Sequence, residues 1–407
     1  MYVRQAPGFE VPGKEDWVCK LRKGLYGLPP SGRIAQKRLE KVLMESCDFK
    51  QCDTEPTAFN YRSETGHVNA GFYVDDGKLI TDNDNIVHEK AAILAEHGLK
   101  GKVIKNPTKF LGIEYHYYEN GSVLLHQEPH VEKMIFKQGL NFRCSKSLTT
   151  PTIVTDNDDT TSIDDQEPLT QEEKGSYQAF CGDAIWLLRT RYDLAFSTSH
   201  RCSNMSKPTR KDLEGGKRFT RYLIGKSRRG LIFHPALEGE RLSTYAYVDS
   251  GIKGAYPVSG VAVFLGVPDD NSHQNRNAAV VAFTKKERIV ANSTMDGEIM
   301  AIERGIMSID YVNNLRGELG FPETDTSVIF TDSQPAIRFL SGTGSTSNRQ
   351  TRHLRRRIAF IKQAIIQRRI TLKWVPSASN CADVLTKPLS AEVHERHVRN
   401  LMGENPI

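Results

Sequence analysis

Four acidic residues in the C-terminal half of the sequence stand where an α/β fold gathers polar groups. They are Asp249 on a predicted strand, Glu298 in the first turns of a predicted helix, Asp332 at the end of a strand and Asp383 at the start of a helix. Strand ends and helix starts meet at one edge of an α/β sheet. We therefore expect the four carboxylates to lie close together.

A cluster of four bare carboxylates has one obvious chemical use. Carboxylates cannot all stay ionised side by side without a cation to offset their repulsion. Two magnesium ions about 3.5–4 Å apart would offset it, and they would catalyse the hydrolysis of a phosphodiester. Any one of these acids alone is more simply a surface residue or a helix cap. The interpretation depends on finding all four in this order of elements.

The predicted elements around these acids form a mixed α/β sheet. Three strands (residues 244–249, 261–265 and 279–283) precede a long helix over residues 293–319. A strand (327–331), helices up to Gln367, a strand (370–375) and a last helix follow. The alternation along 244–249 predicts a half-buried strand. Alternating strands and helices of this kind predict a layered α/β domain.

The first half of the chain has a different character. Short strand-like runs (71–74, 109–114 and 122–125) flank a predicted helix at 86–97. Residues 155–173 carry eight acids and no Lys or Arg, which predicts a solvated linker or long loop. Helices are predicted at 177–191 and 211–224. A length of 407 residues fits two or three domains.

Composition removes several classes of protein. The chain is 38% hydrophobic and 26% charged, which is globular, and its net charge of +6 allows a nucleic-acid partner without requiring one. No apolar run approaches the roughly 18 residues of a membrane helix. The first residues lack an apolar signal segment, and seven scattered cysteines contain no C-x-x-C pair. We expect an intracellular protein that is not secreted, without a membrane or a zinc knuckle.

The contexts of the four acids resemble the ribonuclease H domain of copia-type retrotransposon Pol polyproteins. The matching segments are Tyr247–Gly251, Asn292–Ile299, Thr331–Gln334, Arg352–Arg357 and Ala382–Leu389. The resemblance implies that Asp249, Glu298, Asp332 and Asp383 bind two Mg²⁺ ions. It also implies that they cut the RNA strand of an RNA–DNA hybrid, which is then the expected partner.

The N-terminal part resembles the reverse transcriptase of the same family. Tyr73–Asp76 is similar to its metal-binding hairpin, which implies that Asp75 and Asp76 are metal ligands of a polymerase site. An ordinary hairpin turn containing Asp-Asp-Gly would look the same. Further similar segments raise the weight of the resemblance, at residues 18–28, 110–114, 190–196 and 221–225. The resemblance extends from about residue 1 to residue 403.

A basic segment at residues 349–373 is the candidate surface for nucleic acid. It carries nine Lys or Arg residues and no acid. By itself it could be only the charged face of a helix. On a ribonuclease H-like domain it is better placed to bind a phosphate backbone. The candidate binding residues are Arg352, His353, Arg356, Arg357 and Lys362. The resemblance makes His353 a structural or substrate-adjacent residue rather than a base.

The sequence also departs from the family. It starts at a segment that follows the strand bearing the first polymerase Asp, so we expect an N-terminally truncated fragment whose RNA-directed DNA polymerase activity is lost. The ribonuclease site keeps all four acids. Two alternatives stay open: a non-catalytic nucleic-acid-binding relic of a transposon, or an incomplete part of a full active polyprotein. The histidines of His394–His397 are interpreted as lying on a solvated helix face.

The expected fold class is α/β (α+β), with a partial reverse-transcriptase palm and thumb followed by a ribonuclease H-like mixed sheet with helices. The expected domains are a partial reverse transcriptase (1–150), an acidic linker with thumb and connection helices (151–236), a ribonuclease H-like domain (240–390) and a C-terminal tail helix (391–407).

Overall fold

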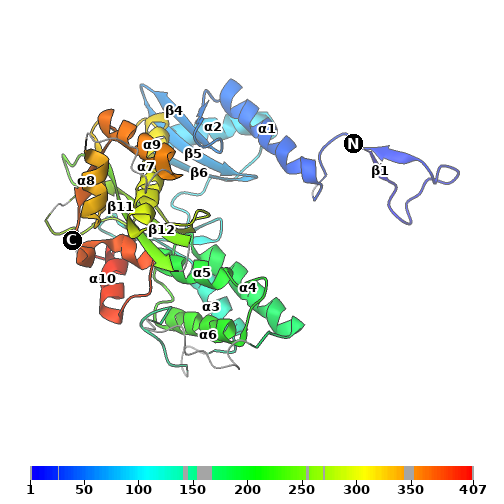
Figure 1. Ribbon diagram of the computed structural model, residues 1–407. Helices are drawn as coiled ribbons and strands as arrows, with labels where there is room; N and C mark the ends of the chain where they lie inside the picture. The colour runs from blue at the N-terminus through cyan, green and yellow to red at the C-terminus, as the bar shows by residue number, and fades with distance from the viewer. Residues whose placement is uncertain are drawn as a thin grey trace. The chain divides into compact units, whose positions relative to one another are not determined.

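The computed structural model describes residues 2–25, 27–140, 145–153, 167–253, 256–268, 271–342 and 353–405. The chain divides into two compact units (Figure 1). The first unit contains residues 1–106 and 314–322, and the second contains residues 107–313 and 323–407. Among the described residues, no helix is both long enough and apolar enough to cross a bilayer.

The first unit is built on a four-stranded antiparallel sheet. Strands β3 (Lys50–Gln51), β4 (Ala58–Ser63), β5 (Gly66–Tyr73) and β6 (Asp76–Thr81) lie in that order. Helices α1 (Pro29–Glu45) and α2 (Asp84–Glu96) join them around one core. Strands β1 (Tyr2–Arg4) and β2 (Val18–Lys20) form a separate antiparallel pair.

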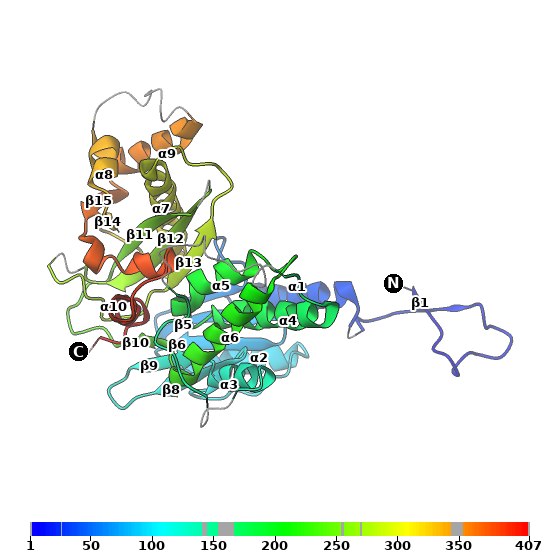
Figure 2. The same ribbon diagram turned by 60° about the horizontal axis from the view of Figure 1, so that its bottom comes forward.

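The second unit opens with a small sheet and a group of helices. Strands β7 (Lys109–Phe110), β8 (Ile113–Tyr117) and β9 (Val123–His126) pair antiparallel, and β10 (Leu231–Phe233) adds to β9. The helices are α3 (Glu128–Lys137), α4 (Gln171–Leu187), η2 (Tyr192–Leu194), α5 (Ala195–Cys202) and α6 (Arg210–Gly225). Helices α3, α4 and α6 share one apolar core (Figure 2).

The predicted acidic loop is shorter than residues 155–173. Helix α4 begins at Gln171, so the last residues of the acidic run form its first turn. Thr170 caps this helix, because its hydroxyl accepts from the Glu173 amide while the Glu173 carboxylate accepts from the Thr170 amide. Residues 154–166 of the predicted linker lie outside the described part of the chain.

A mixed five-stranded sheet forms the body of the second unit. The strands are β11 (Ser243–Lys253), β12 (Tyr256–Gly266), β13 (Val281–Lys286), β14 (Ser327–Thr331) and β15 (Ile370–Trp374). They lie in the order β13-β12-β11-β14-β15, with the first three antiparallel and β14 and β15 parallel to β11. The predicted mixed α/β sheet is therefore confirmed.

Helices cover both faces of this sheet. Helices α7 (Thr294–Glu318), α8 (Gln334–Ser341) and α9 (Arg355–Ile366) share a core with Ala246 and Val248 on one face (Figure 1). The short 3₁₀ helix η5 (Cys381–Leu385) and helix α10 (Ala391–Met402) share a core with Tyr245 and Tyr247 on the other. The prediction that β11 is half-buried is wrong, because its central position places helices on both sides.

The last helix is not a solvated tail. The interpretation of His394 and His397 as exposed is wrong, because both are buried where α10 packs on the sheet. Burial lowers the pKa of each to about 4, so both imidazoles are neutral near pH 7. The last helix also does not begin at Asp383, as the sequence predicted, but at Ala391. Asp383 lies in η5, and Pro388 separates η5 from α10, since proline disfavours a helical residue before it.

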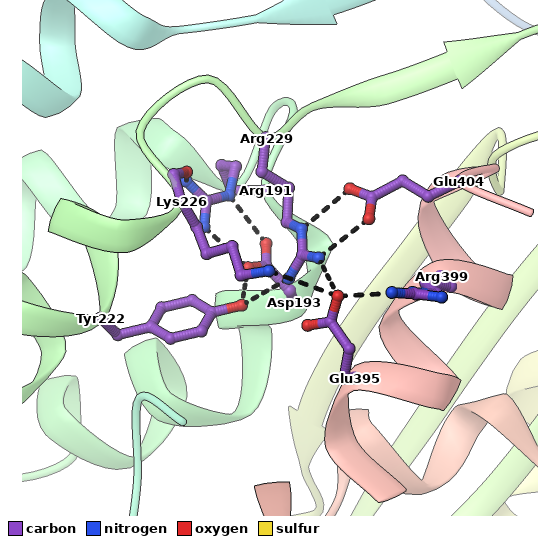
Figure 3. A network of polar contacts seen from close by, with 8 residues as sticks. All are labelled: Arg191, Asp193, Tyr222, Lys226, Arg229, Glu395, Arg399 and Glu404. Carbon is purple, nitrogen blue, oxygen red and sulfur yellow. Dashed lines mark hydrogen bonds and ion pairs between the residues drawn. The ribbon is translucent and has the colours of Figure 1, made fainter. Parts of the chain in front are cut away.

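A buried network of charges fixes α10 to the segment before the sheet (Figure 3). Arg191 donates from Nε and Nη2 to the two carboxylate oxygens of Asp193, at 2.9 and 2.8 Å, and both side chains are fully buried. Arg229 donates to Glu404 at 2.8 Å and to Glu395 at 2.7 Å. The Tyr222 hydroxyl joins the halves, donating to Asp193 and accepting from Arg229.

Replacing Asp193 by Asn tests this network. Burial alone would raise the pKa of Asp193, but the Arg191 guanidinium outweighs it and lowers the pKa to about 2. Asn leaves the fully buried Arg191 guanidinium without its carboxylate, so we expect a loss of about 3–5 kcal/mol, seen as a lower melting temperature. Arg399→Gln removes an exposed partner of Glu395 and should cost about 1 kcal/mol or less. Similar losses in both variants would contradict the interpretation.

Candidate metal centre

Three of the four predicted carboxylates converge at one edge of the five-stranded sheet. Asp249, Asp332 and Asp383 each place one carboxylate oxygen within 4.8 Å of the other two. Asp249 lies on β11, Asp332 directly follows β14 and Asp383 lies in η5. Parallel pairing of β11 with β14 brings the first two together, because Tyr247 is opposite Phe330. This is the edge at which the sequence placed them.

Glu298 lies beside this set but is not one of the three. It is buried in the first turns of α7, and its Oε2 lies 3.5 Å from the Thr331 hydroxyl. Thr331 is the last residue of β14, directly before Asp332. The charges of Asp249 and Asp332 act on Glu298. The fourth carboxylate therefore belongs to the same electrostatic cluster.

Polar side chains outside the predicted set hold these acids in place. Asn380 donates from its amide to the Val248 carbonyl at 3.0 Å, and its Oδ1 accepts from the Ala382 amide at 3.2 Å. These bonds fasten the start of η5 to β11 next to Asp249. The Thr386 hydroxyl donates to Asp249, and Ser377 donates to Asp332. Of Asn380, Thr386 and Ser377, only Thr386 lies in a segment whose sequence resembles the ribonuclease H family, Ala382–Leu389.

Glycine allows η5 to approach the sheet. Gly260 of β12 is paired with Asp249 of β11. A Cβ at Gly260 would lie 2.9 Å from Leu385 Cβ and 3.0 Å from the Ala382 carbonyl oxygen, so any larger residue would push η5 outward. Because Asp383 lies within η5, this close approach brings its carboxylate to Asp249.

The site is strongly acidic and poorly solvated. Burial first, and then the charges of Asp249 and Asp332, raise the pKa of Glu298 to about 9. Burial and the charge of Asp249 raise the pKa of Asp383 to about 7. Burial also raises the pKa of Asp249. Ionising Asp249, Glu298 and Asp383 together is thus unfavourable here without a cation.

The donor set fits a hard divalent cation. Every candidate ligand is a carboxylate oxygen, the type of ligand that Mg²⁺ and Ca²⁺ prefer over nitrogen or sulfur. One basic side chain also reaches the cluster, and sequence reasoning gave it no role. The Nζ of Lys387 lies 3.1 Å from Asp383 Oδ1 and 3.5 Å from Asp249 Oδ2. Lys387 follows Asp383 by four residues, and this spacing could have indicated from the sequence that the two side chains form an ion pair.

The two polymerase candidates lie in a different setting. Asp75 lies in the turn between β5 and β6, and Asp76 is the first residue of β6, where it pairs with Tyr73. The predicted strand–turn–strand is therefore present. Both acids are exposed. Within the described residues, the one set of three His, Cys, Asp or Glu side chains with ligand atoms this close is Asp249, Asp332 and Asp383. Asp75 and Asp76 have no described third partner.

The predicted nucleic-acid-binding residues fall into separate environments. Arg352 lies outside the described residues. His353 Nε2 is 3.3 Å from Asp296 Oδ2, and Arg357 pairs with Glu303 of α7. Lys362 donates to the Gly342 carbonyl at 2.9 Å. Arg356 is exposed in the first turn of α9. Several of these cations thus also hold α9 to its neighbours.

Comparison with known proteins finds similarity to retrotransposon polyproteins. Residues 1–154 match the family described as reverse transcriptase (RNA-dependent DNA polymerase). The chain is 27% identical over 395 residues to the retrovirus-related Pol polyprotein from transposon RE1 of Arabidopsis thaliana, covering 96% of this chain and 25% of that protein. It is 24% identical over 405 residues to the corresponding polyprotein from transposon TNT 1-94 of Nicotiana tabacum, covering 95% and 28%.

These matches confirm the predicted resemblance to copia-type Pol polyproteins over nearly the whole chain. The chain spans about a quarter of the length of these relatives. Among solved structures, LC11-RNase H1 in complex with RNA/DNA hybrid aligns at 17% identity with a TM-score of 0.27, covering 35% of this chain and 94% of that one. The N-terminal RNase H domain of rv2228c from Mycobacterium tuberculosis aligns at 18% identity and a TM-score of 0.26, covering 39% and 98%.

The raised carboxylate pKa values predict an unusual pH dependence of stability. A carboxyl whose pKa is higher when folded stabilises the protein at low pH and loses that contribution as pH rises through its folded value. Metal-free protein should therefore lose stability between about pH 4.5 and pH 9 on account of Glu298. Glu298→Gln removes the titrating group and should melt several degrees higher than the unsubstituted protein at pH 8, with little difference near pH 4.5.

Glu392→Gln provides the matched control, because Glu392 is exposed in the first turn of α10. Its melting temperature should follow that of the unsubstituted protein at both pH values. Scanning calorimetry in a chelating buffer measures all three proteins. A Glu298→Gln variant that melts lower at pH 8 than the unsubstituted protein would show that this carboxylate is not destabilised there.

Proposed function

We propose that this retrotransposon Pol region hydrolyses the RNA strand of RNA–DNA hybrids, with Mg²⁺ as cofactor. The observation that carries the proposal is the convergence of Asp249, Asp332 and Asp383 at one edge of the mixed sheet, with Glu298 beside them. The resemblance of their contexts to copia-type ribonuclease H domains supports this choice of reaction. The acids come from four separate segments, so their meeting at one edge depends on the whole domain.

The proposed mechanism gives each carboxylate a role. Asp249, Asp332, Asp383 and Glu298 would hold two magnesium ions. When bound, such ions supply Lewis acidity that activates water and stabilises the leaving oxygen in phosphodiester hydrolysis. Asp249 is held by Thr386 and Asp332 by Ser377, so these two ligands keep a fixed orientation. Asp249 lies on β11 and Asp332 directly follows β14, so paired strands of the sheet position both acids, which limits reorganisation during the reaction.

The proposed substrate fits the exposed basic residues at the start of α9. Arg356 in the first turn of α9 is exposed, and the neighbouring Arg355 is exposed as well. Guanidinium groups bind phosphate oxygens without reading sequence. The 2′-hydroxyls of the RNA strand would distinguish a hybrid from duplex DNA. We propose Arg352, His353, Arg356, Arg357 and Lys362 as the nucleic-acid-binding set.

Asp332→Asn is the direct test of the ribonuclease site. Asn keeps the size of the side chain and still accepts from Ser377, so the fold should survive. The loss of one carboxylate ligand should reduce Mg²⁺-dependent cleavage of a labelled RNA–DNA hybrid by about a hundredfold or more. Asp325→Asn, at an exposed ion pair with Arg241, should cleave at the unsubstituted rate. Normal cleavage by Asp332→Asn would show that the site is wrongly assigned.

The cleavage assay also separates the proposed enzyme from a binding relic. A relic would bind the hybrid in a salt-sensitive manner and leave it intact, because phosphate contacts release counterions whether or not the acids act. Cleavage by the unsubstituted chain and its loss in Asp332→Asn would exclude that alternative.

For the polymerase half we propose no activity in this chain. Phosphoryl transfer by two metal ions requires carboxylates that bridge both ions, and Asp75 and Asp76 have no third acid near them among the described residues. A primer-extension assay with RNA template, dNTPs and Mg²⁺ should give no product. Extension that disappears in Asp75→Asn would overturn this proposal.

A further inference from the structure

We infer that the Lys387 ammonium is an internal counter-ion of the acid cluster in the metal-free protein, and that divalent cations must displace it to bind. The inference rests on the proposed metal site and deepens it. Lys387 Nζ lies 3.1 Å from Asp383 Oδ1 and 3.5 Å from Asp249 Oδ2, bridging two of the three converging carboxylates. Within the described residues, it is the one basic side chain within 4.0 Å of any of the four acids.

The fold determines where Lys387 lies. Its backbone amide donates to the Asp383 carbonyl at 3.2 Å, and the Thr386 amide donates to the same oxygen at 3.1 Å. The Thr386 hydroxyl donates to Asp249. Thr386 and Lys387 are thus both hydrogen-bonded to Asp383, and Thr386 is also hydrogen-bonded to Asp249. Asp383 and Asp249 are the two acids that the ammonium faces. The position of Lys387 is built into η5 and the turn that follows it.

Burial makes a counter-ion necessary at this position. The side chains of Asp249 and Asp383 are only 3% and 8% exposed. Asp383 Oδ1 is buried and has no hydrogen-bond partner, so the nearby ammonium is its main compensation. A buried carboxylate without any partner is costly. Lys387 therefore offsets part of the repulsion that the cluster would otherwise carry.

The same geometry makes Lys387 a competitor of metal. Mg²⁺ binds carboxylate oxygens directly, at about 2.0–2.1 Å, and it would use the oxygens that Lys387 faces. A positive ammonium at 3.1–3.5 Å from those oxygens repels an incoming dication. The Lys387 side chain is 40% exposed, so its flexible stem gives the ammonium a route into solvent. Metal binding then exchanges one cation for another.

Manganese binding measured on the full chain tests the inference, because Mn²⁺ prefers the same oxygen ligands and is detected by electron paramagnetic resonance. Lys387→Met removes the charge at similar length, and it should tighten Mn²⁺ binding by about tenfold, equivalent to about 1.4 kcal/mol. The metal-free Met variant should also melt at a lower temperature at pH 8. Lys387→Arg keeps the charge and should bind Mn²⁺ within about twofold of the unsubstituted protein. Lys387→Gln repeats the test with a second neutral side chain.

Two controls make the outcomes distinct. Lys207→Met removes an exposed lysine between α5 and α6 and should change neither Mn²⁺ affinity nor melting temperature. Asp332→Asn should weaken Mn²⁺ binding, as the proposed metal site requires. If it does, and Lys387→Met binds Mn²⁺ equally or more weakly than the unsubstituted protein, the counter-ion inference alone is overturned. Absence of Mn²⁺ binding in every protein would overturn the metal site together with the inference.

Discussion

The main constraint on this domain is the electrostatic repulsion among the carboxylates of Asp249, Glu298, Asp332 and Asp383, three of which are buried from solvent. Asp249, Glu298 and Asp383 are each less than one-tenth exposed, and each has a raised pKa. An ordinary core would not tolerate such a group, because unpaired buried charge lowers stability. Two hydroxyl donors, Thr386 and Ser377, and the Lys387 ammonium contact the cluster and offset part of this cost. The site is thus a local source of instability that the rest of the sheet must support.

That support comes from both faces of the sheet. The face that carries Ala246 and Val248 packs against α7, α8 and α9, and the face that carries Tyr245 and Tyr247 packs against η5 and α10. The second core also includes Ala195 and Leu231 from the segment before the sheet. The buried network around Arg229 ties α10 to that same segment. The layer that carries Asp383 is therefore stabilised by residues that precede the sheet in sequence.

Sequence patterns predicted the order of strands and helices well, but they did not predict the polar residues that contact the acids. The strand and helix order from residue 243 onward was predictable, because apolar periodicity reports which faces are buried. The four acids were found because strand ends and helix starts in such an order share an edge. Asn380 and Ser377 were missed, since a polar residue in a loop has no periodicity to reveal it. His394 and His397 were misplaced because a helix rich in charged residues looks solvated. One of its charged residues, Glu395, instead pairs with Arg229 of an earlier segment.

The short 3₁₀ helix η5 and the turn after it position both the Asp383 carboxylate and the Lys387 ammonium that offsets its negative charge. A regular α-helix would also place residues four apart on one face. Here the 3₁₀ helix ends at Leu385, and the next two amides both bond to the Asp383 carbonyl. The turn therefore folds the lysine back over the acid that precedes it. Gly260 then lets this turn approach β12 closely enough for both groups to reach Asp249. An acid and the ammonium that offsets its charge thus lie on the same turn, so any change in the position of η5 moves both groups relative to Asp249.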